Sequence, residues 1–158
     1  MKKFLPSVLL LSVFLLMCGC SDNEKQIALN AYNCQLNIQC DAWKYKGTLI
    51  IEGKDEIRYK VCSPTELDGI EFILSDDELD ISLSDIRIDS DFAAINSPVA
   101  EMLTVISFLH EKPLFVSPDG FAELTVEDTG KNYLCEIDCD RGLVTGISND
   151  KVNAKFVY

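Results

Sequence analysis

The residue types that could perform acid–base chemistry are scarce in this chain. His110 is the only histidine. On a helical wheel it falls beside Val99 and Leu103 on an apolar face, at the C-terminal end of a predicted helix, where the helix dipole favours a cation. A histidine in this position is typical of packing or capping rather than of a general base. Because an enzyme needs a base, a nucleophile or a metal site, the sequence predicts no catalytic residues and a protein that is not an enzyme.

Acidic side chains gather in one segment and raise the question of a calcium site. They are Asp76, Asp77, Glu78, Asp80, Asp85, Asp89 and Asp91. The segment lacks the D-x-[DN]-x-[DN]-G order of a calcium-binding loop. Its members in the predicted strand alternate with Leu79, Ile81 and Leu83, so they point to water. The sequence favours a solvated acidic face with no metal or cofactor, and weak cation binding is the alternative.

The spacing of the cysteines limits thiol chemistry. Cys34 and Cys40 would lie about 20 Å apart in one extended strand. Cys135 and Cys139 would lie about 13 Å apart, so neither pair can form a disulfide or share a zinc ion, and only a bond between strands is possible. The odd number of cysteines in the body of the chain and the inward phase of these four favour reduced thiols that pack as small apolar side chains. Cys62 is out of phase and is predicted to be an exposed thiol.

The N-terminus has the layout of a bacterial export signal. Lys2 and Lys3 precede an apolar run over residues 4–17, which is a charged region followed by an apolar region of signal-peptide length. The run is shorter than the about 20 apolar residues that a spanning helix needs. Residues 1–19 are therefore predicted to be a signal peptide. A plain secretory peptide and an N-terminal anchor helix are the alternatives.

The end of this run contains a candidate site of lipid attachment. The sequence Leu16-Met17-Cys18-Gly19-Cys20-Ser21 resembles a lipobox, in which a small residue precedes the cysteine that takes diacylglycerol before cleavage. Gly19 directly before Cys20 favours Cys20 as the lipidated residue, and Cys18 is the competing acceptor. The sequence predicts a lipoprotein that is exported and held on the extracytoplasmic face of the cell membrane.

The charge and length of the remaining chain limit its partners. Removal of residues 1–19 leaves 139 of the 158 residues, and the loss of two lysines changes the net charge from −12 to −14. This balance excludes nucleic acid and predicts no basic patch that could hold an anionic membrane surface, so contact with the bilayer depends on the lipid. Residues 20–28 are predicted to be a lipidated tether and 29–158 a single domain, since no linker interrupts a chain of this length. We expect a monomer.

Apolar and polar residues alternate from Tyr32 onward, which is the period of a half-buried β-strand. The first such strand places on one face Tyr32, Cys34, Leu36, Ile38 and Cys40. The same period recurs over residues 43–51, 57–61, 70–74, 79–83, 114–116, 122–126, 133–139, 143–147 and 152–156. Turn residues separate these segments. They predict the strands of one antiparallel sheet that is exposed to water on one side.

One helix interrupts the strands. Ser97 and Pro98 supply an N-cap and a first-turn proline, and apolar residues at helical spacing predict an amphipathic helix over 97–110. About nine or ten one-sided strands share this helix, and only a strongly curved sheet lets so little material cover them. The predicted fold is therefore mainly β with α: a strongly curved antiparallel sheet, or half-open barrel, with at least one helix in its concave face.

The inward phases of the strands are rich in aromatic residues, and these can be ordinary core residues. The shortage of helices leaves a second interpretation, in which the concave face is a hollow for an apolar ligand. The candidate ligand-binding residues are Tyr32, Trp43, Tyr45, Tyr59, Phe72, Met102 and Ile106.

The order of these elements resembles the LolA/LolB-like lipoproteins, with the closest likeness to small lipid-anchored members. The likeness rests on the lipobox, the strand from Tyr32, the run Tyr45-Lys46-Gly47, the Pro-x-x-Leu-x-Gly-x-x-Phe pattern of residues 64–72, the helix, and closing hairpins with Gly142-Leu143. The resemblance implies a half-open barrel with helices as a lid over a hollow for lipid or acyl chains. This chain departs from the carriers by being lipidated itself and by lacking a clear second lid helix.

Two functions follow from these observations. The first is a non-enzymatic, membrane-anchored envelope lipoprotein that binds a lipid or another hydrophobic ligand in an apolar hollow. The alternative is an interaction or structural lipoprotein whose core is filled, and which works through its acidic outer face or an exposed edge strand.

Overall fold

The computed structural model describes residues 25–27, 33–41, 43–52, 56–76, 78–84, 86–88 and 97–158. This part of the chain contains one α-helix, α2 (Pro98–Glu111), and a short 3-10 helix, η1 (Thr65–Leu67). The strands are β1 (Lys25–Ile27), β2 (Asn33–Cys40), β3 (Trp43–Glu52), β4 (Glu56–Ser63), β5 (Ile70–Ser75), β6 (Glu78–Leu83), β7 (Ile86–Ile88), β8 (Leu114–Val116), β9 (Phe121–Val126), β10 (Lys131–Asp138), β11 (Leu143–Ser148) and β12 (Val152–Val157).

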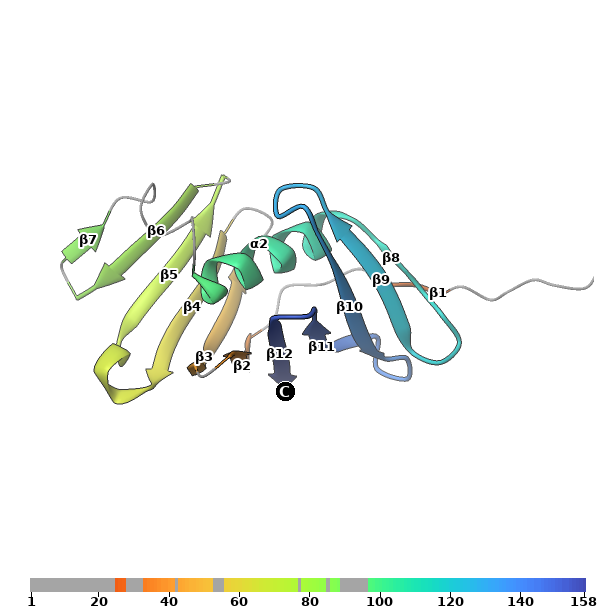
Figure 1. Cartoon of the computed structure of the whole chain (residues 1–158), viewed down its shortest axis with the longest axis horizontal. Helices are drawn as coiled ribbons and strands as arrows, with labels where there is room; N and C mark the ends of the chain where they lie inside the picture. The colour runs from red at the N-terminus through yellow and green to blue at the C-terminus, as the bar shows by residue number, and fades with distance from the viewer. Residues whose placement is uncertain are drawn as a thin grey trace, which may run out of the picture.

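One antiparallel sheet contains ten of these strands, in the order β7-β6-β5-β4-β3-β2-β12-β11-β10-β9. Two runs of strands, β2 to β7 and β9 to β12, pair with their neighbours along the chain, as short turns between strands favour. The runs join where β12 pairs with β2, so the C-terminal strand lies in the middle of the sheet (Figure 1). The outermost strands do not pair with each other, so the sheet is not closed. These features confirm a mainly β, antiparallel fold with a helix.

Helix α2 lies across one face of the sheet and contacts β2, β4 and β5 (Figure 1). It begins as predicted, because the Ser97 Oγ accepts a hydrogen bond from the Ala100 N–H at 3.5 Å and Pro98 occupies the first turn. The helix ends at Glu111, one residue beyond the predicted segment. The buried residues that hold it against the sheet are Val99, Ala100, Met102, Leu103, Val105, Ile106 and Leu109.

The predicted alternation of burial is present in the central strands. In β2, the side chains of Cys34, Leu36 and Ile38 are buried and belong to the hydrophobic core that includes α2. We call the side of the sheet against α2 the covered face and the opposite side the outer face. Full burial of a leucine or isoleucine contributes about 1.5 to 3 kcal/mol, so the covered face is the main source of stability.

Two short strands were not predicted. Strand β1 falls within the predicted tether of residues 20–28, pairs with β8, and buries Ile27. Strand β7 extends the sheet beyond β6. The first described strand thus begins five residues after Cys20. The lipobox, Tyr32 and four acidic residues of the predicted solvated face (Asp77, Asp85, Asp89 and Asp91) lie outside the described residues.

No helix in the part of the chain that the structure describes is both long enough and apolar enough to cross a membrane.

Candidate functional site

Three of the candidate ligand-binding residues lie inside the core. Met102 and Ile106 of α2 have no exposed surface, and neither has Tyr59 of β4. The Tyr59 hydroxyl donates a hydrogen bond to the Leu36 carbonyl oxygen at 3.1 Å, and burial raises the pKa of Tyr59. The helix therefore fills the middle of the covered face with side chains.

Trp43 lies outside this core, although the sequence placed it in an inward phase. Its position in the register is opposite Cys40, on the covered face, but it begins β3 at the end of the sheet and is 61 % exposed. Its ring stacks on that of Tyr45, with ring centroids 6.5 Å apart, and Tyr45 is half-buried. The alternation therefore gives the correct face for Trp43, and its exposure arises because burial also requires a covering element above the residue.

The covered face of β5 to β7 carries apolar side chains that α2 leaves partly open. Phe72 pairs with Tyr59 of β4 on one side and with Ile81 of β6 on the other. Burial decreases along this row, because Tyr59 is fully buried whereas Phe72 and Ile81 are half-buried. In the neighbouring rows of β6, Leu83 is 43 % exposed but Leu79, opposite Leu74, is buried. We call these side chains the β5–β7 strip. Its members are Ile70, Phe72, Leu74, Ile81, Leu83 and Ile86.

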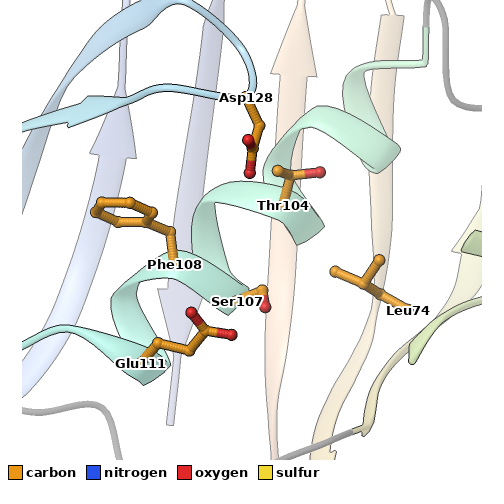
Figure 2. A pocket seen from close by; sticks show the side chains of 6 residues that line it. All are labelled: Leu74, Thr104, Ser107, Phe108, Glu111 and Asp128. Atoms are coloured by element: carbon orange, nitrogen blue, oxygen red, sulfur yellow. The ribbon is translucent and has the colours of Figure 1, made fainter. Parts of the chain in front are cut away.

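A pocket of about 320 Å³ adjoins this strip. Leu74 of the strip forms one wall, and Asp128, in the turn between β9 and β10, forms the opposite wall (Figure 2). Its floor is the side of α2 that faces away from the sheet. The helix residues that line it are Thr104, Ser107, Phe108 and Glu111. The strip and the pocket share Leu74, so together they form one continuous partly open surface.

The pocket is mixed in character, and this limits what it can hold. Leu74 and Phe108 supply apolar surface, while Glu111 and Asp128 bring two carboxylates and Thr104 a hydroxyl. An anionic group would meet two like charges there, which is unfavourable. The site therefore suits an apolar chain whose polar end is neutral or positively charged.

Most residues of this site are not predicted by the sequence. Phe72 is among the predicted ligand-binding residues, whereas Leu74, Phe108, Glu111 and Asp128 are not. The one feature of the sequence that points to this site is Phe108, an aromatic residue on the polar side of an otherwise amphipathic helix. A large apolar side chain at such a position needs a partner outside the face that packs on the sheet.

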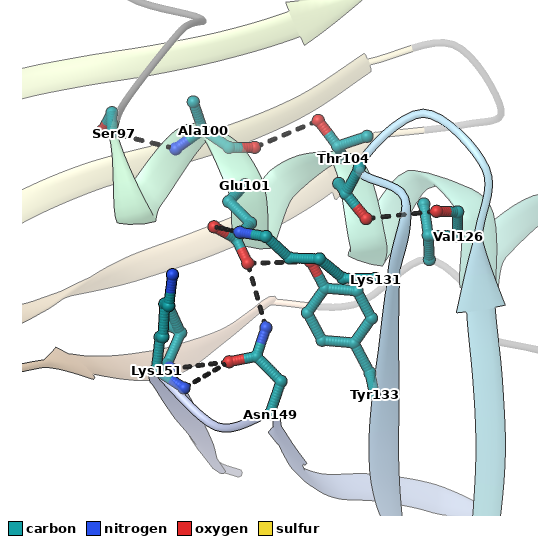
Figure 3. Close-up of polar contacts among 11 residues, drawn as sticks. Ser97, Ala100, Glu101, Thr104, Val126, Lys131, Tyr133, Asn149 and Lys151 are labelled. Carbon is teal, nitrogen blue, oxygen red and sulfur yellow. Dashed lines mark hydrogen bonds and ion pairs between the residues drawn. The ribbon is translucent and has the colours of Figure 1, made fainter.

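A polar cluster fixes α2 against the other half of the sheet (Figure 3). The Glu101 carboxylate accepts hydrogen bonds from Lys131 Nζ at 2.7 Å, from the Tyr133 hydroxyl at 2.8 Å and from Asn149 Nδ2 at 3.1 Å. Only 17 % of the Glu101 side chain is exposed. Desolvation raises the pKa of Glu101, but these hydrogen bonds and the charge of Lys131 outweigh it, so that the pKa lies below its usual value. The cluster is structural, because none of its members lines the pocket.

Acidification should weaken the fold through Glu101. Since its pKa is lower in the folded state, its contribution to stability is complete above the unfolded pKa of about 4.3 and is lost as the pH falls through the folded pKa. Urea unfolding should show a lower midpoint for Glu101→Gln than for the wild type at pH 7, and the difference should shrink at pH 3. Glu123→Gln, at an exposed position of β9, is the control and should show neither effect. A constant difference between wild type and Glu101→Gln across this pH range would contradict the assignment.

None of the cysteines in the described part of the chain forms a disulfide. No cysteine pairs with another in the register, because Cys34 faces Leu49 and Cys135 faces Ile147 and Ala122. Burial raises the pKa of Cys34 to about 11 and that of Cys135 to about 12, which keeps both protonated and unreactive at neutral pH.

Cys62 is exposed, as predicted. It is the extra residue of a β-bulge, since Ser63 pairs with Lys46 and Val61 with Gly47. Its thiol donates a hydrogen bond to the Lys46 carbonyl oxygen at 3.2 Å.

Metal chemistry has no candidate within the described residues, where no three His, Cys, Asp or Glu side chains come together as ligands. His110 lies in the last turn of α2 and is half-buried. A comparison of the chain with protein-family models gives no match, and neither does a comparison with curated proteins.

Proposed function

We propose that this chain is an exported, lipid-anchored envelope lipoprotein of the LolA/LolB-like type, and that it binds an apolar ligand without catalysing a reaction. In this proposal the sheet is a strongly curved half-open barrel, and lipid on Cys20 holds the domain at the membrane. The antiparallel sheet with a helix on one face supports the fold assignment. The apolar run before Cys20 supports export and anchoring.

The observation that carries ligand binding is the incomplete cover over β5 to β7. Beneath α2 the core is fully buried, whereas the β5–β7 strip and the adjoining pocket stay partly open. Soluble proteins leave contiguous apolar surface exposed mainly where something binds. The ligand site is therefore at the edge of the helix, over Phe72 and Leu74, rather than beneath Met102 and Ile106.

The ligand class follows from the lining. The strip offers aliphatic and aromatic surface to an acyl chain, while Glu111 and Asp128 disfavour a carboxylate at the pocket. We expect a neutral acyl lipid to bind more tightly than a fatty acid of the same length. Displaced water and buried CH₂ groups supply the affinity, at about 0.8 kcal/mol for each CH₂.

The alternative function, an interaction lipoprotein with a filled core, is favoured by a different observation. Ile86 of β7 is 65 % exposed and lies on the outermost strand of the sheet. An edge strand has unpaired backbone groups that can pair with a strand of a partner protein.

Binding of a fluorescent monoacylglycerol to residues 21–158, which contain every described element, tests the ligand proposal. Saturable binding is expected, and Phe72→Ala should weaken it several-fold because Phe72 lines the open strip. Phe121→Ala is the matched control, since Phe121 is 42 % exposed on β9 at the other end of the sheet, and it should bind normally. No uptake by the wild type, together with no lipid in native mass spectra of protein purified without detergent, would favour the interaction protein.

The lipid anchor is tested at Cys20. Cys20→Ala should leave the precursor uncleaved and unlabelled after growth with a radioactive fatty acid, because both lipid transfer and cleavage depend on that thiol. Cys18→Ala is the control and should keep its label. Label that persists in Cys20→Ala and disappears in Cys18→Ala would show that Cys18, and not Cys20, is the lipidated residue.

A further inference from the structure

The outer face of the central strands gathers lysines that are far apart in the sequence. Lys155 of β12 pairs with Asn37 of β2, which in turn pairs with Lys46 of β3. Since neighbouring strands lie about 4.8 Å apart, Lys155 and Lys46 stand about 10 Å from each other in one row across the sheet. Lys44 precedes Lys46 on the same side of β3, and Lys60 of β4 pairs with Thr48 in the next row. We call Lys44, Lys46, Lys60 and Lys155 the lysine face; all four are exposed.

The outward side chains of β2 and β12 that lie between these lysines are neutral. The outward residues of β2 are Asn33, Gln35, Asn37 and Gln39, and β12 contributes Asn153. Among the described residues, none of the four lysines forms an ion pair with a carboxylate. Acidic side chains border the lysine face: Glu71 of β5 is directly opposite Lys60, and Glu136 lies over Gly146, which pairs with Lys155. Glu52 and Glu56 pair at the far end of β3 and β4, next to Arg58.

This arrangement corrects the expectation that an acidic chain has no basic patch. The chain has 26 acidic and 14 basic side chains, and its net charge is −12. A net charge is a sum over the whole surface, however, and the strand order concentrates positive charge on β12, β2, β3 and β4. The opposite charge is displaced to other surfaces, including the pocket with Glu111 and Asp128.

We infer that the lysine face docks on the anionic headgroups of the membrane that carries the anchor. This inference rests on the proposed lipid at Cys20. Cys20 precedes Lys25 of β1 by five residues, so the folded part begins at most about 18 Å of chain from the bilayer. So short a tether keeps the domain beside the surface, where lysines that approach within about 8 Å, one Debye length at physiological ionic strength, are only partly screened from it. Lysines close to an anionic leaflet are attracted to it, while the acidic surfaces of the same domain are repelled.

Docking in this way sets the direction in which the ligand site opens. The lysine face and the helix α2 lie on opposite faces of the sheet. With the outer face on the membrane, the β5–β7 strip and the pocket point away from it. The anchored domain then presents its site to molecules arriving from the aqueous side rather than to lipids of its own leaflet.

The reactivity of individual lysines in the anchored full-length chain tests this orientation. The purified lipoprotein is reconstituted in vesicles of phosphatidylcholine alone or with 30 % phosphatidylglycerol, and is treated briefly with an acetylating ester before mass spectrometry. Lys112 is the internal control, because it is exposed just beyond α2 with its Nζ 4.1 Å from the centroid of the Phe108 ring. In the phosphatidylglycerol vesicles the four lysines should react several-fold more slowly than in phosphatidylcholine, with Lys112 unchanged, and 0.5 M salt should remove the protection.

A double variant shows whether the lysines are protected together by docking or each by its own local surroundings. In Lys44→Gln/Lys46→Gln the protection of Lys60 and Lys155 should also fall, whereas Lys112→Gln should leave it intact. Equal lysine reactivity on both kinds of vesicle in a chain that stays with them would overturn the docking and leave the anchor standing. A chain that floats with neither kind of vesicle would overturn both. Protection on phosphatidylcholine that grows with protein density would show contact between copies of the chain and overturn the membrane as the partner.

Discussion

Replacement of Met102 by alanine should lower the free energy of unfolding by about 2 to 5 kcal/mol. Met102 has no exposed surface and lies on the side of α2 that packs on the sheet. Removal of its side chain leaves a cavity between the helix and the strands, which a packed core only partly closes. Thermal unfolding should show a fall in melting temperature of roughly 10 °C for a domain of this size.

The same variant distinguishes a filled core from a hollow beneath the helix. Ser107→Ala, on the side of α2 that faces away from the sheet, is the matched control and should change stability by less than about 0.5 kcal/mol. Met102→Ala should still bind ligand at temperatures where it is folded, because the site is over the β5–β7 strip. A variant that keeps its stability but loses ligand binding would place the ligand beneath α2, in the hollow of the concave face that the sequence predicts.

The parts of the fold that could be predicted are those determined by local pattern. In β2 the alternation of Cys34, Leu36 and Ile38 with amides indicates a strand covered on one side, and Ser97 followed by Pro98 marks the start of α2. Both signals lie within a few residues of the structure that they predict. The pairing of β12 with β2 could not be predicted, because it joins residues at opposite ends of the chain and either strand could have paired elsewhere with the same pattern.

The candidate site was harder to predict than the fold for the same reason. Leu74, Phe108 and Asp128 belong to three segments that meet only when α2 crosses the sheet. Each residue alone has an ordinary role as a strand, helix or turn residue. The lysine face is a comparable case, since Lys155 reaches Lys46 only through the central position of β12. The composition gives the number of lysines and carboxylates, but it does not show which of them lie close together in the folded chain.

Replacement of Gly47 by alanine should destabilise the domain by about 1 to 3 kcal/mol or more, although glycine is usually a weak residue in a strand. A Cβ atom at this position would lie 2.3 Å from the Lys60 carbonyl oxygen and 2.7 Å from the Tyr59 ring. The Lys60 carbonyl belongs to the backbone of β4, and the Tyr59 hydroxyl is tied to the Leu36 carbonyl oxygen. The carbonyl cannot move without disturbing the β3–β4 pairing, and the ring cannot move without straining its hydrogen bond to Leu36. The run Tyr45-Lys46-Gly47, on which the resemblance rests in part, therefore contains a glycine that the packing of Tyr59 requires.

Gly146→Ala is the matched control for this close approach. Gly146 also lies in a strand, but the atom nearest to its added Cβ is Oε2 of the flexible Glu136 side chain, at 3.1 Å. Its cost in urea unfolding should therefore be small beside that of Gly47→Ala. In a Tyr59→Leu background, Gly47→Ala should cost less than in the wild type, because the ring contact is absent, but a penalty from the Lys60 carbonyl should remain. Equal costs for the two glycines, or no coupling between Gly47 and Tyr59, would show that the contact with the ring does not determine the residue at position 47.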